Sequence, residues 1–411
     1  MRHNKHHQRQ SEFHPPMLKP QPKSGDCIAA LAELVKFDTT SRNSNLELIE
    51  FVQNQLDAIG ISSRLTFDEG KTKANLWATI GPEIEGGVVL SGHTDVVPVD
   101  GQDWTSDPFE LTERDGRLFA RGTCDMKGFV ACAFAHAQAM KDADLKVPIH
   151  FAFSYDEEVG CVGVQGLIKD MQENLPKPLA VIVGEPTSMQ IVGAHKGGHS
   201  YVTTVRGLDG HSSAPALGAN AIFYAARILN FIEKLSHRLK ADGDPDNGFE
   251  PYYTTVDCGV IEGGTARNII PAQCEFSWGF RNVPGDDTHA FAQEVFDFIE
   301  AEIEPELKAI SDQCGVSHLE QHYLPAMIPD EQSSAETLLR HLTGLNQSGR
   351  VSYGTEAAHF QNAGVPGVIF GPGSIKQAHL PDEYIDISQM TACHEFMLKL
   401  TDWAVSNGRA G

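Results

Sequence analysis

Apolar residues in the first part of the chain form short runs separated by stretches with helical spacing. The runs predict strands buried on both faces at 88–92, 147–154 and 179–184. Helical spacing predicts helices at 27–36, 45–59 and 126–141. Strands that alternate with helices indicate an α/β domain with a mostly parallel sheet covered by helices.

A different pattern begins after residue 196. It predicts, in order, a strand at 201–207, a helix at 219–240, strands at 252–262 and 270–281, and a helix at 288–304. This β-α-β-β-α order is typical of a small α+β unit with one antiparallel sheet and two helices. The α/β pattern then resumes, with a helix near 331–344 and a strand at 365–373.

We therefore predict a domain formed by 26–196 and 312–411, with a second domain, 197–311, inserted into it. Residues 1–25 are basic and Pro-rich and have almost no periodic apolar positions, so we expect a disordered arm. The arm contains His3, His6, His7 and His14, which a solvated tail explains better than a metal site.

Charge and cysteine usage narrow the function. The 411 residues include 32 Lys plus Arg and 55 Asp plus Glu, a formal net charge of −23, which disfavours nucleic acids and anionic membranes as partners. The eight cysteines have no paired spacing, as expected of reduced thiols in the cytoplasm. No run is long enough to span a bilayer, and the N-terminus lacks the apolar core of a signal peptide. A small-molecule substrate is the partner we expect.

The strand at 88–92 leads directly into a candidate site. His93 and Asp95 follow it, and in an extended chain side chains two positions apart point the same way. Asp95 could then hydrogen-bond one ring nitrogen of His93 while the other nitrogen binds a metal. A capped turn with a satisfied histidine is the alternative.

Five groups at strand ends or in loops form an inventory of metal ligands. They are His93, Asp125, Glu158, Glu185 and His379. Imidazole and carboxylate ligands without thiolate suit a catalytic divalent ion such as Zn²⁺, Co²⁺ or Mn²⁺. Five ligands suit two ions with one bridging carboxylate, and Asp125 is our candidate for the bridge.

Glu157 precedes the proposed ligand Glu158, and neighbours in an extended chain point in different directions. One carboxylate can bind metal while the other takes a proton from the substrate water and passes it to a leaving amine. This is the chemistry of amide hydrolysis. For an isolated run of acids, a solvated turn is the alternative.

Four motifs in this order carry a resemblance to a known family: SGHTDVVPVD, GTCDMKG, SYDEEVGC and GEPT. They resemble the dinuclear zinc family of aminoacylases and carboxypeptidases. The resemblance implies a zinc-peptidase-like catalytic domain with an inserted lid that also forms a dimer interface. It implies one ion on His93 and Glu185 and the other on Glu158 and His379. Asp125 would lie between them, with Glu157 as the general base and Asp95 orienting His93.

The resemblance also assigns residues of the predicted lid. His211, in DGHSSAP, would stabilise the oxyanion from the partner subunit of a homodimer. Asn268 and Arg281 would grip the substrate carboxylate, for which a guanidinium fork is suited. We expect His195 and His199 to be structural, and Cys124 to be a packing residue.

The later motifs YGTEA and GPGSIKQAHLPDEY most resemble family members that hydrolyse N2-acetyl-L-ornithine to L-ornithine and acetate in arginine biosynthesis. Glu356, in YGTEA, could pair with the terminal ammonium of ornithine. Within the family the alternatives are desuccinylation of succinyl-diaminopimelate and a broad deacylase of N-acyl-amino acids. A zinc aminopeptidase and a non-catalytic binding protein on the same scaffold are further alternatives.

Overall fold

The computed structural model describes residues 25–406, so the expected arm lies outside the described residues apart from Gly25. Its centre is an eight-stranded mixed sheet. In spatial order the strands are β1 (Ser63–Phe67), β2 (Ala74–Ile80), β6 (Ile149–Ser154), β3 (Val88–His93), β7 (Ala180–Val183), β14 (Gly367–Ile369), β8 (Val192–His195) and β13 (Gly349–Val351). The four central strands β6, β3, β7 and β14 are parallel to one another. The α/β architecture with a mostly parallel central region is confirmed.

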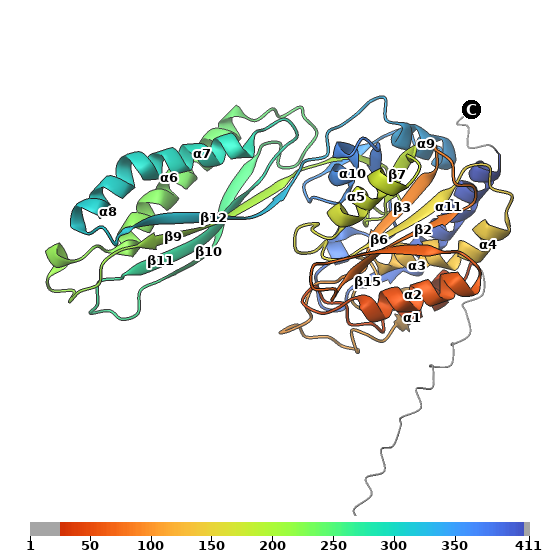
Figure 1. Cartoon of the computed structure of the whole chain (residues 1–411), viewed down its shortest axis with the longest axis horizontal. Helices are drawn as coiled ribbons and strands as arrows, with labels where there is room; N and C mark the ends of the chain where they lie inside the picture. The colour runs from red at the N-terminus through yellow and green to blue at the C-terminus, as the bar shows by residue number, and fades with distance from the viewer. Residues whose placement is uncertain (1–24, 407–411) are drawn as a thin grey trace, which may run out of the picture.

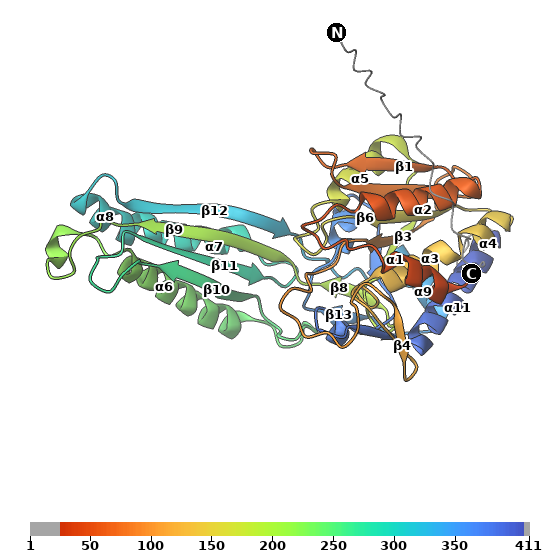
Figure 2. The same cartoon turned by 90° about the horizontal axis from the view of Figure 1, so that it is seen from below.

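Helices cover both faces of this sheet (Figures 1 and 2). One face packs against α1 (Cys27–Leu34), α2 (Leu46–Ala58), α3 (Lys127–Ala135), α4 (Ala137–Asp142), α9 (Ser334–Thr343) and α11 (Ile387–Val405). The other packs against α5 (Val164–Asn174) and α10 (Ala357–Asn362). On β3, Val88 and Leu90 enter the first core and Val89 enters the second. This strand is therefore buried on both faces, as its continuous apolar run predicts.

A separate lobe carries a four-stranded antiparallel sheet (Figure 1). Its strands, in spatial order, are β10 (Thr255–Gly263), β11 (Gln273–Arg281), β9 (Gly198–Arg206) and β12 (Gly315–Leu324). One face is covered by α6 (Ala221–Asp242), α7 (Thr288–Phe298) and α8 (Glu304–Ile310), with a π-helical segment (Ile299–Ile303) between the last two. The order β9, α6, β10, β11, α7 is the β-α-β-β-α order read from the sequence.

Two features differ from the expectation. β12 pairs with β9 along its length, so the smaller sheet continues past 311 into the stretch assigned to the first domain. Which sheet an edge strand joins depends on the strand it pairs with, and the residues of the edge strand alone do not specify that partner. The helix expected over 126–141 is interrupted at His136, which separates α3 from α4.

Shorter elements complete the larger part of the molecule. A three-stranded sheet consists of β15 (Tyr384–Asp386), β5 (Arg117–Phe119) and β4 (Thr112–Arg114). Single 3₁₀ turns occur at Pro215–Leu217 and Ile375–Gln377. Within 25–406, no helix combines the length and apolar character that crossing a membrane requires.

Candidate metal centre

The candidate site lies at the carboxyl ends of three neighbouring parallel strands. β3 ends in His93, β6 is followed by Glu157 and Glu158, and β7 is followed by Glu185. Because β3 pairs with both β6 and β7, these ends meet at one edge of the sheet. Asp125 joins them from the loop that leads into α3.

The structure brings the other four predicted ligands together around Asp125. One carboxylate oxygen of Asp125 lies 3.0 Å from Nε2 of His93, and the other lies 3.2 Å from Nε2 of His379. Glu185 lies on the His93 side, with its Oε1 3.6 Å from Nε2 of that ring. Glu158 lies on the His379 side, at 3.1 Å between Oε2 and Nε2. Asp125 therefore stands between two histidine–carboxylate pairs.

Glu157 also belongs to this cluster. Its Oε2 lies 4.0 Å from Nε2 of His93, and its Oε1 accepts a hydrogen bond of 3.2 Å from the Cys161 thiol. Two groups of donor atoms each lie within 4.8 Å of one another: His93 with Glu157 and Glu185, and His93 with Asp125 and Glu158. Distance alone does not decide which glutamate binds metal, but the contact with His379 favours Glu158.

The cluster concentrates negative charge out of water. Burial, together with neighbouring carboxylates, raises the pKa of Glu157 and Glu185 well above the usual range, and raises that of Glu158 to about 7. Burial also opposes ionisation of Asp125, but hydrogen bonds from His379 and His93 lower its pKa. Hydrogen bonds to Asp125 and Glu158 raise the pKa of His379 to about 10. Buried carboxylates in this number call for a cation.

The residues fit a divalent metal. Oε1 of Glu158 is buried and has no hydrogen-bond partner within the described part of the chain, although a buried carboxylate oxygen normally has one. The donor set of imidazole nitrogens and carboxylate oxygens suits Zn²⁺, Co²⁺ or Mn²⁺.

Asp95 acts on this site differently from the sequence-based prediction. The backbone carbonyl of Asp95, 2.9 Å away, is the group that hydrogen-bonds Nδ1 of His93, whereas the nearer carboxylate oxygen lies at 3.6 Å. The carboxylate instead accepts hydrogen bonds from the backbone N–H groups of Glu157 and Glu158, at 3.1 and 3.2 Å, and from Ser41. β3 ends at His93, so Asp95 lies outside the strand, and its side chain reaches the loop after β6.

Glu383 was missed by the sequence analysis. It is buried, and its carboxylate accepts hydrogen bonds from the backbone N–H groups of Gly122, Cys124 and Asp125 at 2.8–3.0 Å. Arg121 pairs with it at 2.8 Å. Glu383 therefore fixes the loop that carries Asp125. Its position in the LPDEY segment shows nothing of this, because its partners lie far away in the sequence.

A cavity of about 460 Å³ opens onto the cluster. Its lining includes Asp125, Glu157, Glu158, Glu185 and His379, together with Arg281 from the end of β11 in the smaller lobe. His322 of β12 and Tyr353 also line it, and the sequence analysis identified neither. Arg281 is thus the predicted substrate-binding residue that this chain brings to the cavity.

The other predicted substrate residues lie elsewhere. His211 and Asn268 are exposed in adjoining loops of the smaller lobe, where the Ser212 N–H donates to the Asn268 carbonyl at 3.0 Å. Glu356 is 1% exposed, and its carboxylate accepts hydrogen bonds from Ser91 and Ser154. The carboxylate therefore lies buried beneath the cluster. This burial does not support the pairing of Glu356 with a substrate ammonium.

The three residues that we expected to be structural or packing residues, His195, Cys124 and His199, are all buried. His195 is buried and its Nδ1 donates to the Lys196 carbonyl at 2.8 Å. Cys124 is buried, with its thiol 3.3 Å from the Ser374 carbonyl. His199 is buried in the smaller lobe with donor atoms of His289 and Glu320 nearby.

The site has histidines and carboxylates at strand ends beneath an open cavity, which is the arrangement of a metal-binding hydrolase. Comparisons with known proteins agree with this class. The model of Peptidase family M20/M25/M40 matches residues 89–402, and the chain belongs to this family. An acetylornithine deacetylase of Myxococcus xanthus is 38% identical over 90% of this chain and 95% of its own. One of Proteus mirabilis is 34% identical over 91% and 94% of the two chains.

Solved structures share the fold at lower sequence identity. An M20 family metallo-carboxypeptidase from Sulfolobus solfataricus superposes with a TM-score of 0.73 at 18% identity, covering 93% of this chain and 99% of its own. A dinuclear metal-binding M20 peptidase from Bacillus subtilis gives a TM-score of 0.63 at 17% identity, covering 93% and 98%. These similarities confirm the two-sheet M20 fold.

Proposed function

We propose that this chain hydrolyses N2-acetyl-L-ornithine to L-ornithine and acetate, and thereby serves arginine biosynthesis. The observation that carries the proposal is the cluster around Asp125, in which all five predicted ligands are present. The chain that holds this cluster is 38% identical to an acetylornithine deacetylase over 90% of its length. Nothing in the cluster has been replaced by a residue unable to bind metal, which argues against a non-catalytic binding protein.

We propose that two divalent ions, Zn²⁺ or in its place Co²⁺, bind here. His93 and Glu185 would hold one, Glu158 and His379 the other, and Asp125 both. When bound, the ions would acidify a water molecule and polarise the substrate carbonyl. The contacts of Asp125 with both histidines support this assignment.

Glu157 is proposed as the general base. It would take a proton from the attacking water and then deliver it to the amine nitrogen as the amide C–N bond breaks. The second proton of the water follows by the same route, so acetate leaves with the water oxygen and ornithine leaves with a protonated amine. Glu157 lines the cavity, where its carboxylate can reach such a water.

Arg281 is proposed to bind the substrate α-carboxylate, because it lines the cavity and its guanidinium can donate two parallel hydrogen bonds. Asn268 would assist it, and His211 would stabilise the oxyanion. Both of these residues lie away from the cavity of their own chain, so they would act on the active site of a partner subunit. The proposal therefore includes a homodimer.

The smaller lobe offers a surface for this dimer. Among the described elements, no helix lies over the face of its sheet opposite α6 and α7 (Figure 1). Apolar side chains on its outer strands are exposed, with Leu319 of β12 at 66% and Val260 of β10 at 55%.

A cytoplasmic location is also proposed, and the eight free cysteines support it.

The experiment is a substrate panel with metal-stripped protein titrated with Zn²⁺ or Co²⁺. Release of acetate from N2-acetylornithine is compared with release from acetylated neutral amino acids and with release of succinate from succinyl-diaminopimelate. Metal-dependent activity that favours N2-acetylornithine is expected. Preference for another substrate would leave the catalytic proposal in place and replace the substrate, whereas no hydrolysis by the folded, metal-loaded protein would refute the function.

A further inference from the structure

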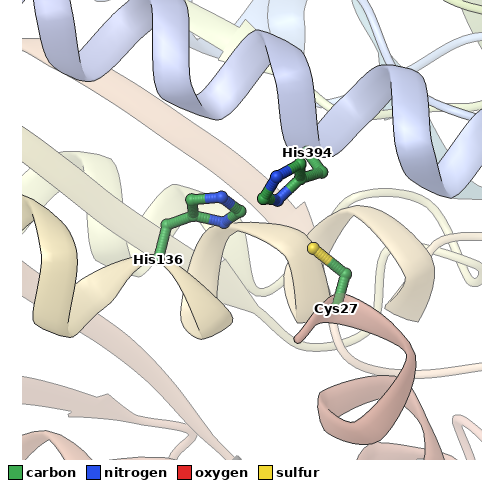
Figure 3. Close-up of side chains that lie close together, drawn as sticks. All are labelled: Cys27, His136 and His394. Carbon is green, nitrogen blue, oxygen red and sulfur yellow. The ribbon is translucent and has the colours of Figure 1, made fainter. Parts of the chain in front are cut away.

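Three side chains from distant parts of the sequence meet outside the strand-end cluster. Cys27 begins α1, His136 stands at the junction of α3 and α4, and His394 lies within α11. Their donor atoms all lie within 4.8 Å of one another. The two rings lie beside each other, with centroids 4.8 Å apart and planes tilted by 47°, and the Cys27 sulfur points toward them (Figure 3).

Each of the two rings has one buried nitrogen with no hydrogen-bond partner among residues 25–406. Nδ1 of His136 lies 2.7 Å from the Cys132 carbonyl, which can only accept, so this nitrogen carries the proton and Nε2 offers a lone pair. The side chain is 1% exposed, and Nε2 has no hydrogen-bond partner. Nδ1 of His394 is likewise buried without a partner. A histidine whose protonated nitrogen is held by a carbonyl is in the state that metal ligands adopt.

The backbone at Gly25 leaves room for this arrangement. Gly25 has a φ of 82° and its N–H donates to the Ala135 carbonyl at 2.8 Å, which brings the start of α1 against the end of α3. A Cβ at this position would lie 3.2 Å from Cε1 of His394 and 3.9 Å from Nε2 of His136. The Cys27 thiol lies 3.7 Å from the Gly25 carbonyl and also interacts with the Cys132 thiol and the ring of His136. It is therefore placed to share a metal ion with that ring.

We propose that Cys27, His136 and His394 bind a thiophilic divalent cation, with Zn²⁺ as the expected ion. One thiolate and two imidazole nitrogens are ligands that Zn²⁺ prefers, and they leave a fourth position for water or a further thiol. Cys132 interacts with the Cys27 thiol and most raises its pKa, and it would be such a further thiol. His394 is partly exposed and gives the ion a route from solvent.

This site is distinct from the proposed catalytic centre. α3 begins two residues after Asp125 and ends at Ala135, next to His136. Its nine residues span about 13 Å at 1.5 Å per residue. A cation held here would tie α1 and α11, the first and last described helices, to α3. Because the unfolded chain lacks the assembled site, binding would stabilise the fold.

The test uses the full chain with His3, His6, His7 and His14 replaced by Ala, so that these residues cannot contribute metal binding. Co²⁺ is titrated into the metal-free protein and the near-ultraviolet thiolate-to-cobalt absorption is recorded. Bound Zn²⁺ is counted per chain after dialysis. Cys27→Ser and His394→Gln are the test variants, and Cys161→Ser is the matched control because Cys161 is the thiol that contacts Glu157.

The expected result is that both test variants lose the thiolate absorption and one zinc per chain, whereas Cys161→Ser keeps both. Addition of Zn²⁺ should also raise the melting temperature of the parent more than that of Cys27→Ser. Glu185→Gln should keep the absorption, so this site is measured whether or not the proposed hydrolysis is correct. Unchanged absorption and zinc content in both test variants would overturn the proposal. So would a Cys27–Cys132 disulfide in the freshly purified chain.

Discussion

The carboxylate of Asp95 accepts a hydrogen bond of 3.1 Å from the backbone N–H of Glu157, and so couples the loop after β3 to the loop after β6. Its second oxygen accepts from Glu158 at 3.2 Å, while its backbone carbonyl holds the ring of His93 at 2.9 Å. One residue therefore positions a proposed base and two proposed ligands. Asp95 touches none of the reacting atoms in this arrangement and is a positioning residue.

Asp95→Asn should lower kcat while leaving the fold intact. The amide keeps one acceptor oxygen but presents N–H groups to a second backbone N–H, so one of the two hydrogen bonds that hold the loop after β6 is lost. We expect a loss of roughly 10- to 100-fold in activity or metal affinity, the range for groups that orient metal ligands. Steady-state kinetics and competition with a chelator measure the two effects. Parent-like values for both would show that the backbone carbonyl alone suffices.

Glu157→Gln and Glu158→Gln should separate base from ligand. Loss of a general base lowers turnover by about 10²- to 10⁴-fold while leaving the ligands in place, so Glu157→Gln should be nearly inactive with its metal content retained. Glu158→Gln should lose metal from the side that includes His379. Metal analysis beside kcat is the measurement. If Glu157→Gln loses the metal and Glu158→Gln keeps it, the two roles are exchanged.

Arg281→Lys should raise KM more than it lowers kcat. Lysine keeps the charge but cannot form the paired hydrogen bonds of a guanidinium with a carboxylate, and one charged hydrogen bond contributes about 1.5–3 kcal/mol. This corresponds to a loss of roughly 10- to 100-fold in kcat/KM. The control substrate is the analogue that lacks the α-carboxylate, on which parent and variant should be equal. An equal loss on both substrates would remove Arg281 from carboxylate binding.

His211→Ala tests catalysis across the dimer. Mixed with Glu157→Ala, it should recover activity, because a heterodimer contains one active site with both an intact base and an intact histidine from the other chain. Random exchange of equal amounts should give about a quarter of parental activity. Each variant alone, carried through the same exchange, is the control. No recovery despite exchange of labelled subunits would contradict action from the partner subunit.

His150 should make the fold less stable in acid. Burial lowers its pKa from 6.5 to about 4, so the unfolded chain binds a proton between these values and the folded chain does not. As the pH falls through this window, stability is lost, by about 2 kcal/mol at about pH 5. His150→Gln should lose correspondingly less stability between about pH 7.5 and about pH 5, as measured by urea unfolding. An identical pH dependence in parent and variant would refute this assignment.

The sequence alone placed the proposed ligands at the edge of the sheet, because that information is local. Val88, Val89 and Leu90 predict a buried strand, and the parallel arrangement of such strands brings their ends together. His93, Glu158 and Glu185 follow from this rule, and the structure places them in one cluster with Asp125 and His379. His93, Glu158 and Glu185 lie at or shortly after the end of an apolar run, and Asp125 lies just before a helix. These positions can be recognised from the local sequence.

Only the tertiary structure decided how these groups are held. The carboxylate of Asp95 bonds the loop of Glu157, whereas its backbone carbonyl bonds the ring of His93. Glu383 binds the backbone of the Asp125 loop from more than 250 positions away. Glu356 is buried, and the ring of His136, between α3 and α4, contacts the ring of His394 in α11. Alternation and spacing fix which residues share a strand or a helix face. Hydrogen-bond partners depend on the direction in which each loop leaves its strand, and packing between distant segments determines that direction.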